Sequence, residues 1–384
     1  MRPEYVERKQ TNCEKWDGME RLFSSNDLLP LWVADMDFKV PEAITKALHE
    51  YVEMGAYGYY KVPDSYYEAF IAWEKRHHGF TVEREWLRFS PGVVSGFNWG
   101  VQMLSKPGDS ILIQQPVYYP FARAIENNER HLVSADLVNH NGHYQVDLEA
   151  FEETIIKEDV KLFILCSPHN PVGRVWTEAE LKGMIALCRK HKVYVLADEI
   201  HQDLVMSPHH HTSAFLAENY QEGMILLTAP SKTFNLAAGQ NSIIIIKDEE
   251  LRARWDKFVL SIAIGSGNAF GYIAAEAGYR EGDEWLQGVK EQIQENYNYL
   301  KDELSRHLPK AVLAPLEGTY LAWLDLGAYL EGKNVTEVME EQCKLAVDYG
   351  NWFAPVGYEN FIRLNLATSL DNIKVATASL CERV

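Results

Sequence analysis

Lys232 is the residue of this sequence whose surroundings most directly suggest chemistry. It lies in the segment APSKTFNLAAGQ, which is rich in small and polar residues and is flanked by two apolar, strand-like runs, ILLT and SIIIIK. A lysine at the end of a buried strand loses hydration, which lowers its pKa toward the range where the neutral amine acts as a nucleophile or base. For the dipeptide SK taken alone, a surface lysine whose ammonium reaches water is the simpler interpretation.

Asp198 and Asn170 follow two further strand-like runs. Asp198 ends VYVLAD, and an acid at the carboxyl end of a central parallel strand lies where open α/β sheets bind ligands and can pair with a heterocyclic nitrogen. Asn170 is held by Pro171 in the turn of CSPHNPVGRV and can offer its amide to a ligand oxygen. Each also has a structural interpretation, since aspartate caps helices and asparagine serves turns.

Two more segments could complete a ligand site. SPGVVSGFNWGVQML places a glycine-containing turn at a predicted helix start, where free N–H groups and the helix dipole favour a phosphate. Arg363, within the strand-like run FIRLNLA, carries a guanidinium that can hold a substrate carboxylate through two parallel hydrogen bonds. The alternative for Arg363 is a structural ion pair with one of the many acidic residues.

Composition narrows the possible partners. The formal net charge of -18 disfavours nucleic acid and anionic membranes, which are bound chiefly through clustered Lys and Arg. The five cysteines form an odd set without CxxC spacing, so neither a disulfide framework nor a zinc knuckle is predicted, and a reducing cytoplasm is the expected location. The N-terminal MRPEYVERKQ lacks the apolar region of a signal peptide, and no apolar run approaches the length of a membrane span.

Three consecutive histidines, His209 to His211, lie in the segment SPHHHTS. Adjacent histidines on a loop do not converge on one ion as a pair spaced by one helical turn does. We therefore expect a solvated loop and no metal site.

The order of the predicted elements is that of an α/β protein. From residue 41 to residue 191, helix-period segments such as PEAITKALHEYVEM alternate with short apolar runs such as SILIQ and KLFILCS. Unbroken β-branched runs of this kind suit parallel strands buried on both faces. After residue 280 a long helical segment, EWLQGVKEQIQENYNYLKDELSRHL, and shorter alternating elements indicate a second, smaller α/β domain.

Three of these segments together, SPHNPVGRV, LADEIH and APSKTFNLAAGQ, in this order and at these separations, resemble the fold-type I pyridoxal-phosphate enzymes of the class I/II aminotransferase superfamily. CEKWD, LPLWVADMDF, YGYY and SPGVVSGFNW resemble more narrowly the MalY/PatB-type cystathionine β-lyases, also called C–S lyases. The resemblance covers nearly the whole chain. It implies a large domain with a central, mostly parallel seven-stranded sheet between helices, and a smaller α/β domain. We place an N-terminal segment that joins the small domain at 1–40, the large cofactor-binding domain at 41–282 and the small domain at 283–384.

The resemblance also implies roles for the residues that match the motifs. Lys232 would carry pyridoxal phosphate covalently and then move protons, Asp198 would keep the pyridine nitrogen protonated, and Asn170 would hydrogen-bond the 3-oxygen of the ring. Tyr118, in QPVYYP, would stack on the ring face, and Arg363 would bind the substrate α-carboxylate.

The phosphate would be held by the backbone amides of Val93 and Val94 and by the hydroxyl of Ser231. Tyr59 would reach it from the neighbouring subunit of a homodimer, so that the active sites lie at the interface. Gln240 stands eight residues after the lysine, where many relatives carry a phosphate-binding arginine. A neutral hydrogen bond is weaker than a charge-assisted one, so the phosphate would depend more on amides, hydroxyls and the helix end.

His201 stands three residues after Asp198, where many aminotransferases have a tyrosine that donates to the 3-oxygen. The sequence DEIH is what the C–S lyase group shows. Two interpretations stay open: the imidazole donates to the cofactor or to Asp198 and tunes the ring by titrating near neutral pH, or it is a structural residue that fixes the loop.

From the resemblance we expect a pyridoxal-phosphate-dependent β-lyase that cleaves L-cystathionine or related cysteine S-conjugates to a thiol such as homocysteine, pyruvate and ammonia. The residues named above serve transamination equally well, so an amino-acid aminotransferase is the alternative. A second alternative is a lyase with an additional regulatory, protein-binding role. No segment resembles an appended helix-turn-helix, and the acidic charge argues against direct contact with DNA.

Overall fold

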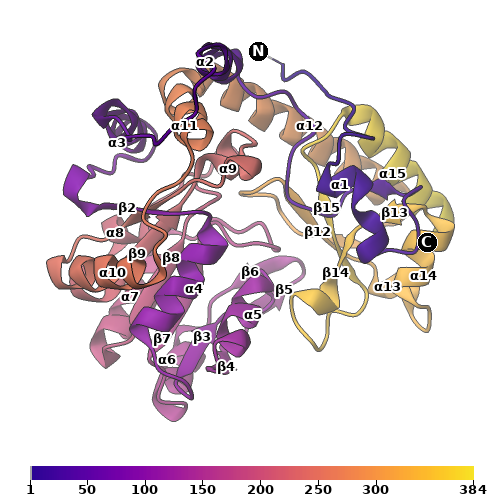
Figure 1. Cartoon of the computed structure of the whole chain (residues 1–384). Coiled ribbons are helices and arrows are strands. Elements are labelled where there is room, and N and C mark those ends of the chain that lie inside the picture. Colours follow the sequence, from indigo (N-terminus) through magenta and orange to yellow (C-terminus); the bar gives the residue numbers. More distant parts are fainter. Residues whose placement is uncertain (1) are drawn as a thin grey trace.

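The computed structural model describes residues 2–384 and contains one large and one smaller sheet with helices around both (Figure 1). The large sheet holds seven strands in the order β2-β10-β9-β8-β7-β3-β4. Their bounds, in that order, are Leu87–Ser90, Ser242–Ile245, Met224–Thr228, Tyr194–Asp198, Leu162–Cys166, Ser110–Ile113 and His131–Ser134. β10 runs antiparallel to both of its neighbours, and the other paired strands are parallel. The predicted mostly parallel seven-stranded sheet is confirmed.

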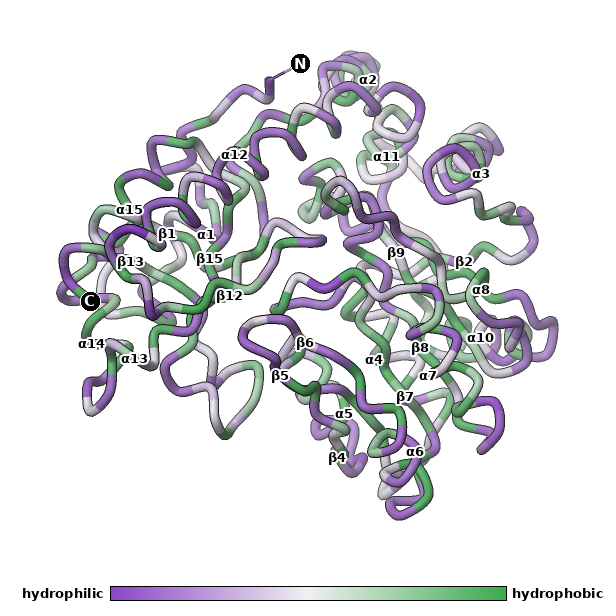
Figure 2. The backbone as a smooth tube through the Cα atoms, turned by 180° about the vertical axis from the view of Figure 1, so that it is seen from behind, coloured by the Kyte–Doolittle hydropathy of each residue, from purple (hydrophilic) through white to green (hydrophobic). Residues whose placement is uncertain are grey.

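The central strands are mostly apolar because helices cover both faces of the sheet. In β7, Phe163 and Leu165 belong to one core cluster, and Leu162 and Ile164 belong to the other. The first cluster includes α6 (Leu148–Lys157) and α7 (Glu178–His191); the second includes α4 (Val93–Leu104), α5 (Pro120–Asn127) and α10 (Glu249–Ile262). In Figure 2 the hydrophobic colour gathers along interior strands such as β7.

The start of α7 shows how local sequence sets a helix boundary. The Thr177 hydroxyl accepts the Glu180 amide, and the Glu180 carboxylate accepts the Thr177 amide in return. This reciprocal capping satisfies two N–H groups that a helix start leaves without partners.

The remaining elements of the large part lie at its edges. α2 (Glu42–Glu53) and α3 (Asp64–His78) both pack on α11 (Ala269–Glu281), as Figure 1 shows. Two one-turn helices, α8 and α9, and a two-stranded hairpin, β5 and β6, complete it. Their bounds are Ala214–Ala217, Pro230–Thr233, Val138–His140 and His143–Gln145.

The C-terminal part is built on a second sheet of four strands in the order β11-β12-β15-β14. Their bounds, in that order, are Val312–Leu313, Leu321–Asp325, Phe361–Asn365 and Asp348–Tyr349, and all three pairings are antiparallel. The helices of this part are α12 (Asp283–His307), α13 (Gly327–Leu330), α14 (Val335–Glu337) and α15 (Leu370–Arg383). Of the helices in residues 2–384, none combines the length and the apolar character that crossing a membrane requires.

The N-terminal segment runs beside the C-terminal part. It holds the short helix α1 (Glu14–Asp17) and the strand β1 (Leu29–Pro30), which pairs in parallel with β13 (Leu345–Ala346). Figure 1 shows α1 next to β13 and β15, far from the N-terminal helices α2 and α3. The division into domains at residues 40 and 282 stays a prediction.

Gly100 of α4 offers a test of the helix-to-sheet packing. A Cβ at this position would lie 2.7 Å from Leu196 of β8. Gly100→Leu should lower the free energy of unfolding by about 1–3 kcal/mol, because overpacking forces side chains off their rotamers or shifts the backbone. Denaturant unfolding followed by circular dichroism measures the change.

The matched control is Gly265→Leu, since nothing lies within 4 Å of a Cβ built at Gly265. That variant should change the free energy of unfolding by no more than about 0.5 kcal/mol. Equal losses in the two variants would contradict the close contact of α4 with β8.

Candidate active site

A cavity of about 200 Å³ opens at the carboxyl ends of the central parallel strands. β7 ends at Cys166 and β8 ends at Asp198, and both residues line the cavity. The chain that leaves β9 adds Ser231 and Lys232 from α9. These residues converge because the carboxyl ends of parallel strands meet at one edge of a sheet.

Most of the predicted site residues face this cavity. Those that line it are Val93, Val94, Tyr118, Asn170, Asp198, His201, Ser231 and Lys232. Arg363 and Tyr59 are not among its lining residues. Arg363 is buried behind Asn170, whereas the Tyr59 side chain is fully exposed on the surface.

The Lys232 amine has a lower pKa than an ordinary lysine. Burial lowers its pKa to about 8, the charge of Arg363 acts in the same direction, and the carboxylates of Asp35 and Asp198 oppose both. The Lys232 Nζ donates a hydrogen bond to the carbonyl oxygen of Ala34 at 2.6 Å. A substantial fraction of the neutral amine is therefore present near physiological pH.

Asp198 is buried at the end of β8 and has a raised pKa of about 7. Burial is the main cause, while the Ile200 amide, which donates at 3.1 Å, and the charge of Lys232 hold the pKa lower than burial alone would. A carboxylate in this position gains from a ligand that brings its own N–H donor or positive charge.

Arg363 and Asn170 are joined in one hydrogen-bond system. The Arg363 guanidinium donates to the Asn170 Oδ1 at 3.0 Å, to the carbonyl of Trp32 at 3.0 Å and to the Asp348 carboxylate. Its Nε has no partner among the described residues. Because the Asn170 Oδ1 accepts from Arg363, its Nδ2 is the group left to donate toward the cavity.

Asp348 neutralises much of the Arg363 charge. Both side chains are buried, and burial raises the pKa of Asp348 to about 6 although Arg363 draws it down. Arg363 therefore forms the structural ion pair that the sequence left open as an alternative, and its Nε–H still has no partner among the described residues.

Tyr118 stays protonated and fixed. Burial raises the pKa of its phenol, and its backbone amide donates to the Asn170 carbonyl at 3.0 Å. The ring is thereby held at the wall of the cavity beside the turn that carries Asn170.

The buried position of His201 disfavours titration near neutral pH, whereas a hydrogen bond from the imidazole to the cofactor stays a prediction. Burial lowers its pKa well below the usual value, and the charges of Lys232 and Arg363 add to the effect. The imidazole is therefore neutral, and it packs edge-on against Tyr320 with ring centroids 5.9 Å apart. Sequence alone gives no access to this burial.

The histidine loop is only partly solvated. His209 and His210 are exposed, but the His211 side chain is buried and its Nε2 lies 3.1 Å from the Glu199 carboxylate. No group of residues suited to a metal ion occurs within residues 2–384.

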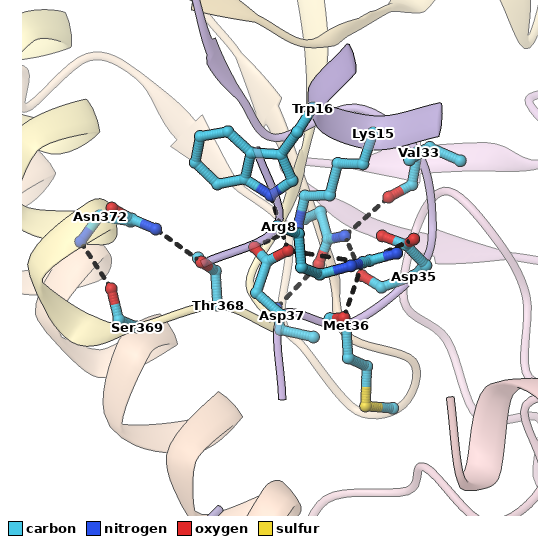
Figure 3. A network of polar contacts seen from close by, with 12 residues as sticks. Arg8, Lys15, Trp16, Val33, Asp35, Met36, Asp37, Thr368, Ser369 and Asn372 are labelled. Atoms are coloured by element: carbon cyan, nitrogen blue, oxygen red, sulfur yellow. Dashed lines mark hydrogen bonds and ion pairs between the residues drawn. The ribbon is translucent and has the colours of Figure 1, made fainter. Parts of the chain in front are cut away.

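The N-terminal segment is locked against the cavity by a buried charge network. The Asp37 carboxylate receives hydrogen bonds from Lys15 at 2.7 Å and from the Trp16 indole at 2.9 Å. Arg8 donates to Asp35 at 2.8 Å. Figure 3 shows Lys15, Trp16 and Arg8 directed toward the two aspartates.

This network positions backbone carbonyls that sequence motifs do not reveal. The Ala34 carbonyl accepts from Lys232 and also from the Tyr320 hydroxyl at 2.8 Å, and the Trp32 carbonyl accepts from Arg363. The segment WVADMDF therefore contacts both the candidate catalytic lysine and the candidate carboxylate-binding arginine. Ala34 and Asp348 are two residues at this site that sequence reasoning missed.

The chain is similar to known proteins over nearly its whole length. The family model described as aminotransferase class I and II matches residues 23–380. The chain is 40% identical to the cystathionine beta-lyase PatB of Bacillus subtilis over 97% of this chain and 98% of that protein, and 30% identical to protein MalY of Escherichia coli over 99% and 97%. Its fold matches the PLP-bound C-S lyase of Staphylococcus hominis with a TM-score of 0.94 at 32% identity, covering 99% of this chain and 97% of that one.

The Lys15–Asp37 pair gives a stability prediction, because both side chains are fully buried. Lys15→Met should lower the free energy of unfolding by about 3–5 kcal/mol, since it leaves the Asp37 carboxylate buried without its main partner. Urea unfolding of the two proteins measures the difference.

The matched control is the Lys39–Glu4 pair, whose side chains are 59% and 67% exposed. Lys39→Met should change the free energy of unfolding by less than about 1 kcal/mol. If Lys15→Met lowers the free energy of unfolding no more than Lys39→Met does, the N-terminal segment does not depend on the buried pair.

Proposed function

The chain belongs to the aminotransferase class I and II family, and from this membership and the cavity geometry we infer that it is a pyridoxal-phosphate-dependent carbon–sulfur β-lyase. Its substrates are L-cystathionine and related cysteine S-conjugates. The reaction consumes water, breaks the Cβ–S bond and releases a thiol, pyruvate and ammonia. The observation that carries the proposal is full-length similarity to lyases combined with a low-pKa lysine at the strand ends.

The described residues fit the parts of pyridoxal phosphate. Asp198 offers a buried carboxylate to the ring nitrogen, the Asn170 Nδ2 is free for the ring oxygen, and Lys232 offers a largely neutral amine to the aldehyde. At the other end, α4 begins at Gly92 without a side-chain cap, so the N–H groups of its first turn are available to a phosphate. The bound cofactor withdraws electrons from the α-carbon of the substrate.

Lys232 is the proton carrier of the proposed mechanism. With the cofactor and substrate bound, its neutral Nζ would take the proton from the substrate α-carbon. The Ala34 carbonyl, at 2.6 Å, holds this amine in place and accepts one of its protons in a hydrogen bond. The departing sulfur takes up a proton as it becomes a thiol.

Arg363 holds the substrate α-carboxylate in this proposal. Its Nε has no partner among the described residues, and Asp348 and the Trp32 carbonyl fix the plane of the group. Tyr118 stays neutral and presents a ring face to the cofactor. His201 serves as a neutral wall residue, for which its lowered pKa is the support.

We further propose a cytoplasmic homodimer. Tyr59 is exposed in the single chain, and so are Met54, Tyr57 and Phe270 nearby in the same part of the fold. A second copy that covers this face would bring its own Tyr59 to the phosphate end of the cavity. All five cysteines are free thiols, which suits a reducing compartment.

The products decide between lyase and aminotransferase. With L-cystathionine as the only substrate, the protein should form thiol and pyruvate in equal amounts without any added keto acid. A thiol reagent and lactate dehydrogenase measure the two products. Steady turnover that requires a keto-acid acceptor and yields no thiol would mean an aminotransferase.

Lys232→Ala should lower this turnover by about 100- to 10,000-fold or more, because it removes the group that moves the α-proton. The control is Lys257→Ala, which changes an exposed lysine on α10 and should leave turnover unaltered. Equal activity of the two variants would remove Lys232 from the mechanism.

The lowered pKa of Lys232 predicts the pH dependence of cofactor loading. Below pH 8 the reaction rate of the cofactor-free protein with pyridoxal phosphate should rise about tenfold per pH unit, and above pH 8 it should level off as the amine becomes fully neutral. Stopped-flow absorbance measures this rate. Asp35→Asn removes an anion that raises the Lys232 pKa, so its midpoint should move to lower pH. A midpoint near that of free lysine would contradict the effect of burial.

A further inference from the structure

The end of the cavity beside α4 is arranged to receive an anion, yet it contains little positive charge. Gly92, Val93 and Val94 place the uncapped start of α4 at the wall, and Ser231 adds a hydroxyl. Among the described residues that line the cavity, Lys232 is the only one with a cationic side chain, since His201 is neutral. An anion at this end must be held by neutral donors.

Asn241 lines the same cavity and has an unused donor. Its exposed fraction is only 5%, and its Nδ2 has no hydrogen-bond partner among residues 2–384. A buried N–H group without a partner is unfavourable by about 1–3 kcal/mol, so such a group normally serves a ligand or a water.

The orientation of the Asn241 amide is fixed from behind. The Tyr66 hydroxyl of α3 donates to the Asn241 Oδ1 at 2.9 Å. Burial raises the pKa of Tyr66 well above its usual value, so the phenol keeps the proton that it donates. With Oδ1 engaged by Tyr66, the Nδ2 is the amide atom free to turn toward the cavity.

Gln240 stands where many relatives carry the phosphate-binding arginine, but it differs from Asn241 in burial. The Gln240 side chain is exposed, and its backbone has a left-handed φ of 46°. On α11, Gly271 leaves room for the chain that leads into Asn241, because a Cβ at that glycine would lie 2.3 Å from the Gly239 oxygen. The protein thus buries Asn241, the residue that follows Gln240, in the wall of the cavity.

We propose that Asn241 binds the phosphate of the cofactor through its Nδ2, as a neutral replacement for the missing arginine, with Tyr66 as the residue that orients it. The proposal rests on the proposed function only in so far as the cofactor is pyridoxal phosphate, and it does not depend on whether the reaction is lysis or transamination.

The test compares two ligands that differ only in the phosphate, pyridoxal phosphate and pyridoxal. Absorbance titration of the cofactor-free protein gives a dissociation constant for each. Asn241→Ala should weaken the binding of pyridoxal phosphate by about 10- to 100-fold, as expected for the loss of a hydrogen bond to a charged group. It should change the binding of pyridoxal by less than about twofold. Asn241→Asp, of nearly the same size, should weaken pyridoxal phosphate further because two anions then face each other.

Two variants separate contact from packing. Tyr66→Phe keeps the ring but loses the orienting bond, so it should weaken pyridoxal phosphate by a smaller factor than Asn241→Ala. Asn98→Ala is the matched control on α4, since the Asn98 Nδ2 already donates to the Val94 carbonyl at 2.8 Å and does not line the cavity. It should bind both ligands as the unchanged protein does.

The outcomes are distinct. Equal weakening of both ligands in Asn241→Ala would assign Asn241 a structural role, and no weakening would show that a water satisfies its amide; either result overturns the proposal. The proposal is also overturned if Gln240→Ala weakens the binding of pyridoxal phosphate selectively and Asn241→Ala does not. If Asn241→Ala fails to fold, the ratio of the dissociation constants of pyridoxal phosphate and pyridoxal, measured with Asn241→Asp, decides. Failure of the unchanged protein to form thiol would refute the lyase function and leave this ratio interpretable.

Discussion

Removal of the Lys232 amine from water is the constraint on which the site depends. An ammonium in a buried position is unfavourable unless a partner compensates it, and the chain supplies a carbonyl rather than a carboxylate as the direct partner. Asp35 and Asp198 act on the amine only through the field that they create. The result is an amine that gives up its proton readily. A directly bonded carboxylate would instead have stabilised the charged form.

The carbonyl partner has to come from a distant part of the chain. Ala34 precedes Lys232 by almost 200 positions, and the buried charges of Lys15 and Asp37 hold its segment in place. The same segment offers the Trp32 carbonyl to Arg363. The N-terminal segment is therefore part of the candidate active site, and its stability and the proton affinity of the lysine depend on the same contacts.

The sequence predicts the sheet and much of the site because both follow from local patterns. Apolar runs identify the strands, and Asp198 and Lys232 follow strands whose carboxyl ends meet. The Ala34 carbonyl is hidden from such reasoning, since every residue carries a carbonyl and only the fold selects one. The sequence also does not show which acidic residue pairs with Arg363, because only the fold brings Asp348 beside it. The neutrality of His201 depends on packing from elements that are far apart in sequence.

The antiparallel strand β10 has a consequence for the placement of two cavity residues, Lys232 and Asn241. β9 and β10 pair with Thr228 opposite Ile243, so the chain leaves the sheet and returns to it at the same edge. A parallel partner would need a crossover and would re-enter at the opposite edge. One hairpin connection therefore carries both Lys232 and Asn241. The spacing between the groups that we propose for the aldehyde and for the phosphate of the cofactor is therefore set within a single loop.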